Sequence, residues 1–204
     1  MRRTEPEWHC APVPPWGTRR ARLLIVGLAP GRAGANRTGV PFTGDDSGTF
    51  LFDGLLRFGF AHRPAHRAAH GAAGGSSARP FRLDGARITN AARCLPPENR
   101  PLPVELRSCR DYLARELGEL FRGGRRRRPV AVFALGRVAH DAVLDALGVP
   151  RRRHLFAHGA AHLLAPRALL VDSFHPSRYN TNTGRLTAPM FDAALARLRD
   201  HLDA

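Results

Sequence analysis

Side chains that could carry out acid-base chemistry or recognise a polar ligand follow the apolar runs of this sequence. Asp45 and Asp46 come after the first run, Asn90 lies in the second, and His175 directly follows the last. A carboxylate can direct a water molecule, an imidazole can donate a hydrogen bond to a developing negative charge, and a carboxamide can pair with the edge of a nucleobase. These residue types suit a hydrolysis that releases an anion.

The basic residues restrict the chemistry further. All 32 Lys and Arg positions among the 204 residues are arginine, so lysine is absent. The chain therefore cannot form a Walker-type phosphate-binding loop, a Schiff base with pyridoxal phosphate or a lysine nucleophile. Catalysis has to use Asp, Glu, His, Ser, Asn or backbone groups.

Charge and composition indicate the partner class. The formal net charge of +15 attracts polyanions, and nucleic acid is the leading candidate. A GC-rich genome would account for arginine in place of lysine, but not for 32 basic residues against 17 acidic ones. No apolar run approaches the roughly 18 to 20 residues of a membrane span, and no secretory signal is visible. Three cysteines without a CxxC pair favour a reducing compartment, so we expect a cytoplasmic protein. We also expect a monomer that has no membrane partner.

The candidate residues need a framework that brings them together. Four apolar runs predict buried strands over residues 22–27, 86–91, 129–136 and 168–174. Helical periodicity predicts helices over residues 48–59, 103–121, 137–147 and 189–202. This alternation predicts a three-layer α/β/α fold with a central, mostly parallel four-stranded sheet. Ligands bind at the carboxyl ends of such strands, which is where the candidate residues lie.

We expect one domain over residues 1–204, with an N-terminal extension over 1–20 and a flexible insertion over 61–80. Histidines recur four residues apart at positions 62, 66 and 70, and again at 154, 158 and 162, a spacing that could align metal ligands on a helix. Pro64 and Gly159 interrupt these stretches, so we expect surface or phosphate-contacting histidines and no metal site.

Taken in order, the motifs after the strands resemble the uracil-DNA glycosylase superfamily, most closely family 5. The resemblance runs from Arg22 to Leu198 and rests on Gly27-Leu28-Ala29-Pro30, Asn36-Arg-Thr-Gly39, Phe42-Thr-Gly-Asp45, His175-Pro-Ser177 and Thr183-Gly-Arg-Leu-Thr187. It implies a monofunctional enzyme that hydrolyses the N-glycosidic bond of uracil in DNA and leaves an abasic site. The alternatives are a glycosylase that prefers hypoxanthine or xanthine, and a catalytically weak module that binds damaged or single-stranded DNA.

The resemblance also implies roles for single residues. Asp45 would position the water and stabilise the cationic sugar, although Asp46 could do so instead and either could cap the following helix. His175 would stabilise the uracil anion at O2, and Asn90 would pair with N3–H and O4. Phe42 would stack on the base. The turn formed by Gly27, Leu28, Ala29 and Pro30 would bind it as well; family 4 has Glu in place of Leu28.

DNA contacts are implied for the segment that follows His175. Tyr179 occupies the place of the side chain that is wedged into the base stack, and Arg178 and Arg185 would contact the phosphate backbone. Ser177 and Asn180 are assigned to the same DNA-binding set.

Families 4 and 5 hold a [4Fe-4S] cluster with four cysteines. Cys94 and Cys109 match the later pair, whereas the N-terminal segment supplies only Cys10, with His9 beside it. Because a complete four-cysteine site is impossible here, we expect packing to replace the cluster; a three-cysteine cluster with an unusual fourth ligand is the alternative. The chemistry itself requires no cofactor.

Overall fold

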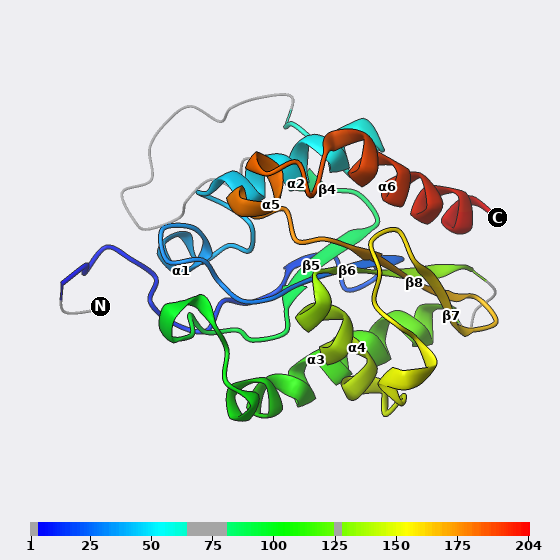
Figure 1. The fold of residues 1–204 in the computed structure, drawn as a ribbon, viewed down its shortest axis with the longest axis horizontal. Helices are drawn as coiled ribbons and strands as arrows, with labels where there is room; N and C mark the ends of the chain where they lie inside the picture. The colour runs from blue at the N-terminus through cyan, green and yellow to red at the C-terminus, as the bar shows by residue number, and fades with distance from the viewer. Residues whose placement is uncertain (1–3, 65–80, 125–127) are drawn as a thin grey trace.

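The structure is a computed structural model that describes residues 4–64, 81–124 and 128–204. A six-stranded sheet lies between two layers of helices (Figure 1). From edge to edge its strands are β1 (Trp16–Gly17), β5 (Ala86–Asn90), β2 (Leu23–Gly27), β6 (Val130–Leu135), β8 (Ala168–Ser173) and β7 (Ala161–Ala165). The predicted three-layer α/β/α class is confirmed.

The four inner strands are parallel, as predicted, but the expected total of four strands is wrong. An antiparallel strand extends each edge, because β1 pairs with β5 and β7 pairs with β8. β1 is only two residues long. β7 alternates exposed and half-buried residues. Neither edge strand has the continuous apolar run that marks a strand buried on both faces.

Two long helices cover each face of the sheet. α2 (Asp46–Arg57) and α6 (Ala188–Asp203) pack on one face, and α3 (Pro103–Gly124) and α4 (Arg137–Leu147) pack on the other. All four match predicted helices with small shifts at their ends. Within the described ranges, no helix is long and apolar enough to cross a bilayer. The shorter elements are α1 (Ala35–Thr38), β3 (Ala61–His62), β4 (Arg82–Leu83), η1 (Pro97–Asn99), η2 (Arg151–Arg153) and α5 (Arg178–Asn182).

Two segments that we expected to lie outside the α/β framework contribute strands. Trp16 and Gly17, within the expected N-terminal extension, form β1. Ala61 and His62, at the start of the expected insertion, form β3 and pair with β4. The rest of the insertion from residue 65 to residue 80, including the histidines at 66 and 70, lies outside the described residues.

The central strands are buried because each supplies side chains to two cores. In β2, Leu23 and Ile25 join the core beneath α2 and α6, whereas Leu24 and Val26 join the core beneath α3 and α4. Strand β6 divides its residues in the same way. A strand with apolar residues on both faces is stable only between two helical layers.

The strand order also creates a site for a ligand. β2 lies between β5 and β6. After β2 the chain first adds β5 along one edge of β2 and later adds β6 along the opposite edge of β2. The loops at the carboxyl ends of β2 and its neighbours therefore diverge and leave a crevice.

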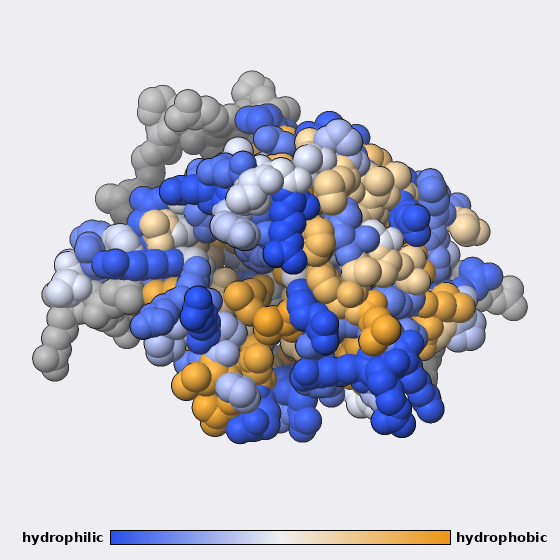
Figure 2. All heavy atoms as spheres, in the orientation of Figure 1, coloured by the Kyte–Doolittle hydropathy of each residue, from blue (hydrophilic) through white to orange (hydrophobic). Residues whose placement is uncertain are grey.

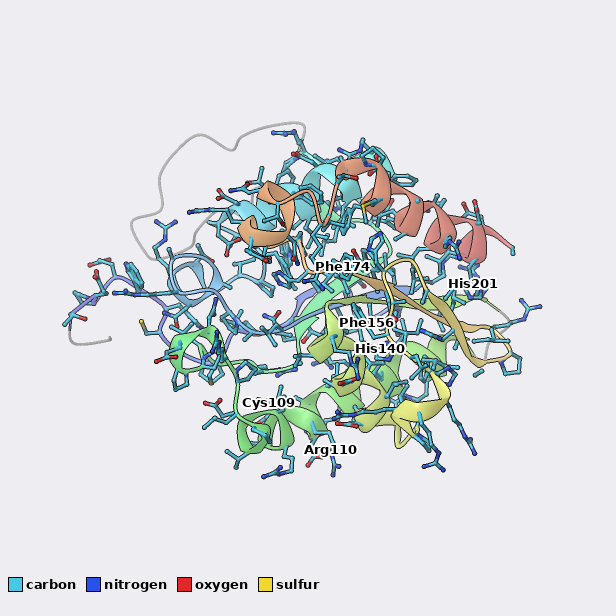
Figure 3. All side chains as sticks on the ribbon, in the orientation of Figure 1. Cys109, Arg110, His140, Phe156, Phe174 and His201 are labelled. Carbon is cyan, nitrogen blue, oxygen red and sulfur yellow. The ribbon has the colours of Figure 1, made fainter. Side chains whose placement is uncertain are left out.

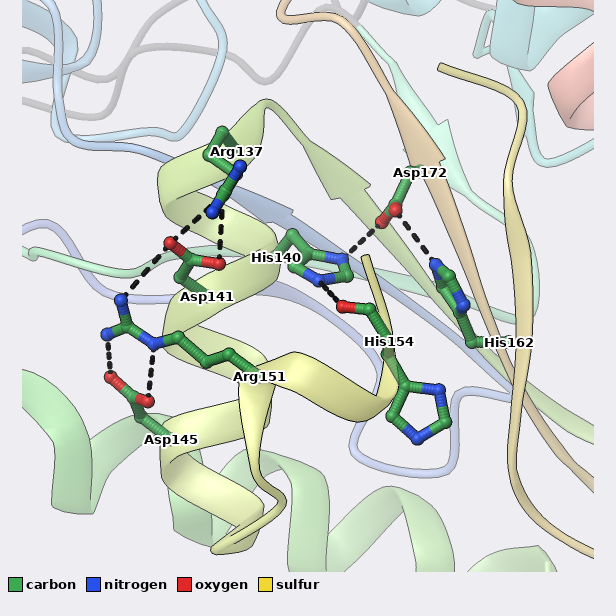
Figure 4. Close-up of polar contacts among 8 residues, drawn as sticks. All are labelled: Arg137, His140, Asp141, Asp145, Arg151, His154, His162 and Asp172. Carbon is green, nitrogen blue, oxygen red and sulfur yellow. Dashed lines mark hydrogen bonds and ion pairs between the residues drawn. The ribbon is translucent and has the colours of Figure 1, made fainter. Parts of the chain in front are cut away.

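A polar cluster is buried between β8, β7 and α4 (Figure 4). Asp172 and His140 are fully buried, and the His140 Nδ1 donates to Asp172 Oδ1 over 2.8 Å. His140 Nε2 donates to the His154 carbonyl over 2.9 Å, and His162 Nε2 donates to Asp172 Oδ2 over 3.1 Å. The side chain of His162 is only 13% exposed, so the expectation of a surface histidine is wrong at this position.

The partners of His140 determine its charge. Because a carboxylate and a carbonyl both accept hydrogen bonds, both ring nitrogens must carry protons. Burial lowers the pKa of His140, but the hydrogen bond and the negative charge of Asp172 outweigh burial and raise the pKa above its ordinary value. The core thus contains an imidazolium paired with a carboxylate.

We predict that Asp172→Asn destabilises the protein by about 3–5 kcal/mol, because it leaves a buried cation without its counter-ion. A raised pKa stabilises the fold below the pKa of free histidine, about 6.5, and this stabilisation is lost as pH rises through the folded-state pKa. The difference in thermal midpoint between wild type and variant should therefore be larger near pH 6 than near pH 9.

The control for this prediction is Asp145→Asn, which removes one of the two carboxylates that pair with Arg151 at the surface, where the Asp145 side chain is 41% exposed. Exposed ion pairs contribute about 0–1 kcal/mol, so the midpoint should change little. A pH-independent difference for Asp172→Asn would contradict the charged state of His140.

Candidate active site

A pocket of about 110 Å³ lies at the carboxyl ends of β2, β5 and β8. It is far smaller than the roughly 300–1,000 Å³ of typical ligand pockets and suits one small planar ring. Seven of the predicted site residues line it: Leu28, Ala29, Phe42, Asp45, Asn90, His175 and Ser177. Four further residues line the pocket but were not predicted from the sequence: Gly31, Ala35, Ser47 and Asn99.

Asn90 presents an unused acceptor in this pocket. Its Oδ1 is the one buried side-chain polar atom, within the described parts of the chain, that has no hydrogen-bond partner. An unpaired buried polar group costs about 1–3 kcal/mol, so such a group in a pocket wall indicates a ligand that donates a hydrogen bond.

Gly27 allows Asn90 and Phe42 to approach the end of β2. A Cβ atom at Gly27 would lie 2.4 Å from Asn90 Oδ1 and 2.6 Å from the Phe42 ring. Asn90 is also the direct neighbour of Gly27 in the parallel pairing of β2 with β5. Glycine is therefore required here because the pocket walls occupy the space of a side chain.

Phe42 lies in the left-handed region of the backbone map, with φ of 54°. This conformation costs about 1–3 kcal/mol for a residue with a side chain and is concentrated at functional sites. The Phe42 ring lies 5.9 Å from the His175 ring, centroid to centroid, at an interplanar angle of 30°. The strained backbone thus places an aromatic ring against the pocket.

Asp45 both caps α2 and lines the pocket. Its Oδ1 accepts a hydrogen bond from the Gly48 N–H over 2.9 Å, and its Oδ2 is so close to Gly34 that a Cβ there would lie 2.1 Å away. Burial and the negative charge of Asp46 raise the pKa of Asp45, while the Gly48 N–H lowers it; the net shift is upward. A carboxylate with a raised pKa is a better proton acceptor.

Asp46 has a different environment from Asp45. Its side chain is 65% exposed and pairs with Arg178 over 2.7 Å. Asp46 is absent from the walls of the small pocket, whereas Asp45 is among them. The geometry therefore favours Asp45 for chemistry in this pocket.

His175 follows β8 and is held by its backbone. Its carbonyl accepts hydrogen bonds from the Ser177 N–H over 2.7 Å and from Asn180 Nδ2 over 2.8 Å. In the described structure no group hydrogen bonds to its imidazole, which leaves the ring available to a ligand. Burial lowers the pKa of His175 to about 4, so the ring is neutral at physiological pH.

The predicted DNA-binding residues have different positions around α5. Tyr179 is 69% exposed at the surface, and Arg178 is exposed beside it. The guanidinium of Arg185 lies 4.7 Å from the centre of the Phe174 ring. Asn180 is half-buried and uses its amide to hold His175, so its direct role in the structure is local. Ser177 caps α5 and lines the pocket.

The three cysteines do not supply a four-thiolate site. All three are free thiols. Cys109 Sγ accepts a hydrogen bond from the Arg93 N–H, and Cys10 Sγ accepts one from the Asn36 amide. Burial, together with the neighbouring Cys109 and Glu105, raises the pKa of the Cys94 thiol. Three thiols cannot complete the four-cysteine ligand set of a [4Fe-4S] cluster.

Comparisons with known proteins identify the family of the chain. A model of the uracil DNA glycosylase superfamily matches residues 14–199, and the chain belongs to this superfamily. Its relatives include the type-5 uracil-DNA glycosylase of Thermus thermophilus, which is 44% identical over 93% of this chain and 79% of the relative. The type-5 enzyme of Pyrobaculum aerophilum is 39% identical over 91% of this chain and 74% of the relative. A type-4 enzyme of Archaeoglobus fulgidus is 33% identical over 65% of this chain and 52% of the relative. The resemblance to family 5 is confirmed.

We predict that Gly27→Ala lowers turnover on uracil-containing DNA by about 100-fold, because a displacement of the pocket walls by about 1 Å has an effect of this size. The turnover is measured by steady-state kinetics, in which alkali cleaves the strand at the abasic sites that the enzyme produces. The control is Gly118→Ala in α3, where a Cβ meets open space and alanine favours the helix. Equal turnover of the two variants would show that the Gly27 contacts do not shape the active pocket.

Proposed function

We propose that this chain is a monofunctional uracil-DNA glycosylase that hydrolyses the N-glycosidic bond between uracil and deoxyribose in DNA and leaves an abasic site. The observation that carries the proposal is the unpaired Asn90 Oδ1 in a base-sized pocket that also contains Asp45 and His175. The names of the type-5 relatives support uracil as the base.

Recognition of the base rests on Asn90 and Phe42. The Asn90 Oδ1 would accept the N3–H of uracil, whereas cytosine has no proton at N3 and would leave this oxygen unpaired. Phe42 would stack on the ring. The small volume of the pocket suits a pyrimidine better than the larger hypoxanthine or xanthine, so uracil is preferred over the alternative substrates.

Departure of the base rests on His175. As the bond between C1′ and N1 breaks, the bonding electrons move to the uracil ring and negative charge gathers on O2. A neutral imidazole can donate its one N–H to this oxygen without becoming charged. Such prepositioned donors are strongest where water is excluded, and the burial that lowers the pKa of His175 indicates such a setting.

Hydrolysis also requires a water molecule on the sugar. Asp45 would orient this water and stabilise the positive charge that develops on the deoxyribose. The water oxygen bonds to C1′, its proton passes to the carboxylate, and the uracil anion departs. Glycosylases that also cleave the strand usually attack with a lysine amine, and this chain has no lysine. Water is therefore the nucleophile, and no step requires a cofactor or an iron-sulfur cluster.

Binding of DNA rests on the net charge of +15 and on the surface near α5. Hydrophilic side chains surround smaller hydrophobic patches on the face shown in Figure 2. Arg178 and Arg185 would contact phosphates, and Tyr179 would fill the gap that the extracted base leaves. We propose a monomer that works in the cytoplasm, where a reducing environment keeps the three cysteines as thiols.

The decisive experiment offers the protein oligonucleotides with a single uracil, hypoxanthine or xanthine, followed by alkali and gel electrophoresis. We expect strand breaks at uracil. Asp45→Asn should reduce kcat by about 100- to 10,000-fold, the usual contribution of general acid-base catalysis, with little change in DNA affinity. Asp46→Asn is the matched control and should remain close to wild type. Absence of breaks with all three bases would refute the enzyme and favour a DNA-binding module.

The exposed position of Tyr179 leads to a separate prediction. Tyr179→Ala should slow excision from duplex DNA more than from single strands, because only duplex DNA requires the base to be extracted from a stack at a cost of a few kcal/mol. Single-turnover rates on the two substrates test this. An equal loss on both would assign Tyr179 to general DNA contact.

A further inference from the structure

Phe174 precedes His175 and is held by three side chains. Its ring stacks on His158 with centroids 5.1 Å apart and an interplanar angle of 23°. The guanidinium of Arg185 lies 4.7 Å from the ring centre, and Phe156 lies 6.2 Å away (Figure 3). The peptide that leads into His175 is therefore held both by side-chain packing and by hydrogen bonds.

His158 has a single protonation state that satisfies its partners. Its Nδ1 accepts a hydrogen bond from the Phe174 N–H over 3.1 Å, so Nδ1 must be without a proton. Its Nε2 donates to the Met190 carbonyl over 3.2 Å, so Nε2 must carry the proton. We expected this histidine at the surface or on phosphate; in the structure it is half-buried, and both ring nitrogens form hydrogen bonds with the backbone.

We infer that His158 is a positioning residue for His175, and that it acts through the backbone of Phe174 as a neutral ring protonated at Nε2. The inference rests on the proposed role of His175. His158 lies on the loop before β7 and does not line the pocket, so it acts on His175 rather than on the substrate.

The physical reason is the short link between the two histidines. The hydrogen bond from the Phe174 N–H to His158 and the stacking of the two rings fix the orientation of Phe174, which directly precedes His175. Without the acceptor at Nδ1, the Phe174 N–H is left unpaired and the end of β8 can shift. A displacement of about 1 Å at a catalytic group reduces turnover by about 100-fold.

Protonation of His158 would have the same effect as removing the acceptor. An Nδ1–H would face the Phe174 N–H, so two donors would oppose each other. The groups packed against His158 are Ser173 at the end of β8, Phe174 directly after β8 and the Met190 carbonyl in α6. Arg185 contacts the Phe174 ring. Burial lowers the pKa of His158, the Met190 carbonyl opposes this, and no charged group is among the causes of the net downward shift. The ring is thus kept neutral.

Two variants separate the hydrogen bond from the packing. His158→Phe keeps a ring beside Phe174 but removes the acceptor, and we expect kcat on a uracil oligonucleotide to fall by about 100-fold with KM and DNA affinity little changed. His158→Asn keeps an acceptor near the position of Nδ1 and should recover most of the lost kcat. Thermal midpoints of both variants report whether the fold is intact.

The pH profile gives a second readout. The ratio of kcat for His158→Asn to kcat for wild type should rise as pH falls from 7 to 5, because only wild type loses its acceptor by protonation. Asp45 and His175 titrate in both proteins, so their effects cancel in the ratio.

The outcomes distinguish the two levels of inference. No excision by wild type would overturn the proposed function and this inference with it. If wild type is active, three results would overturn only the role of His158. They are an unchanged kcat in a folded His158→Phe, equal losses of kcat in both folded variants, and a kcat ratio of His158→Asn to wild type that does not vary with pH. If His158→Phe does not fold, His158→Asn and the pH ratio decide.

Discussion

The close approach of Asn90 and Phe42 to the backbone of Gly27 determines the shape of the pocket. Three segments far apart in the sequence meet there, and the missing Cβ of Gly27 provides the space that they share. Parallel pairing of β2 with β5 brings Asn90 level with Gly27, and a left-handed backbone turns Phe42 towards it. An oxygen is left without a partner at this point, so the site is complete only with a ligand that donates to it.

Burial acts in opposite directions on the two titratable groups of the pocket. It raises the pKa of Asp45 and lowers the pKa of His175, because low polarity disfavours either charge. Asp45 thereby becomes a stronger proton acceptor, and His175 stays a neutral donor. In the proposed mechanism, the same burial would strengthen the electrostatic contacts of both groups with the reacting atoms. The cap that Asp45 provides for α2 keeps the carboxylate in place.

Much of the fold could be predicted from the sequence, because the inner strands β2 and β6 carry apolar residues for two cores and the helices carry one apolar face. The edge strands could not be predicted in this way. β1 has only two residues, and β7 has one partner strand and an alternating exposure that no apolar run reveals. His162 illustrates a second limit, since histidine is usually half-exposed and only the location of Asp172 in β8 makes it part of a buried ion-pair cluster.

The sequence by itself determined that no lysine chemistry is possible, that the chain carries a large positive charge and that the candidate residues follow predicted strands. Only the tertiary structure shows that Asp45 and Asp46 have different environments. The two are adjacent and chemically identical, and the motif that favours Asp45 does not show where either side chain points. Folding turns Asp45 towards Gly34 and the pocket, and turns Asp46 towards Arg178 and solvent. The Asp45 carboxylate is held by the nearby Gly48 N–H, whereas the partner of Asp46 lies 132 residues away in the sequence, so only the fold reveals that partner.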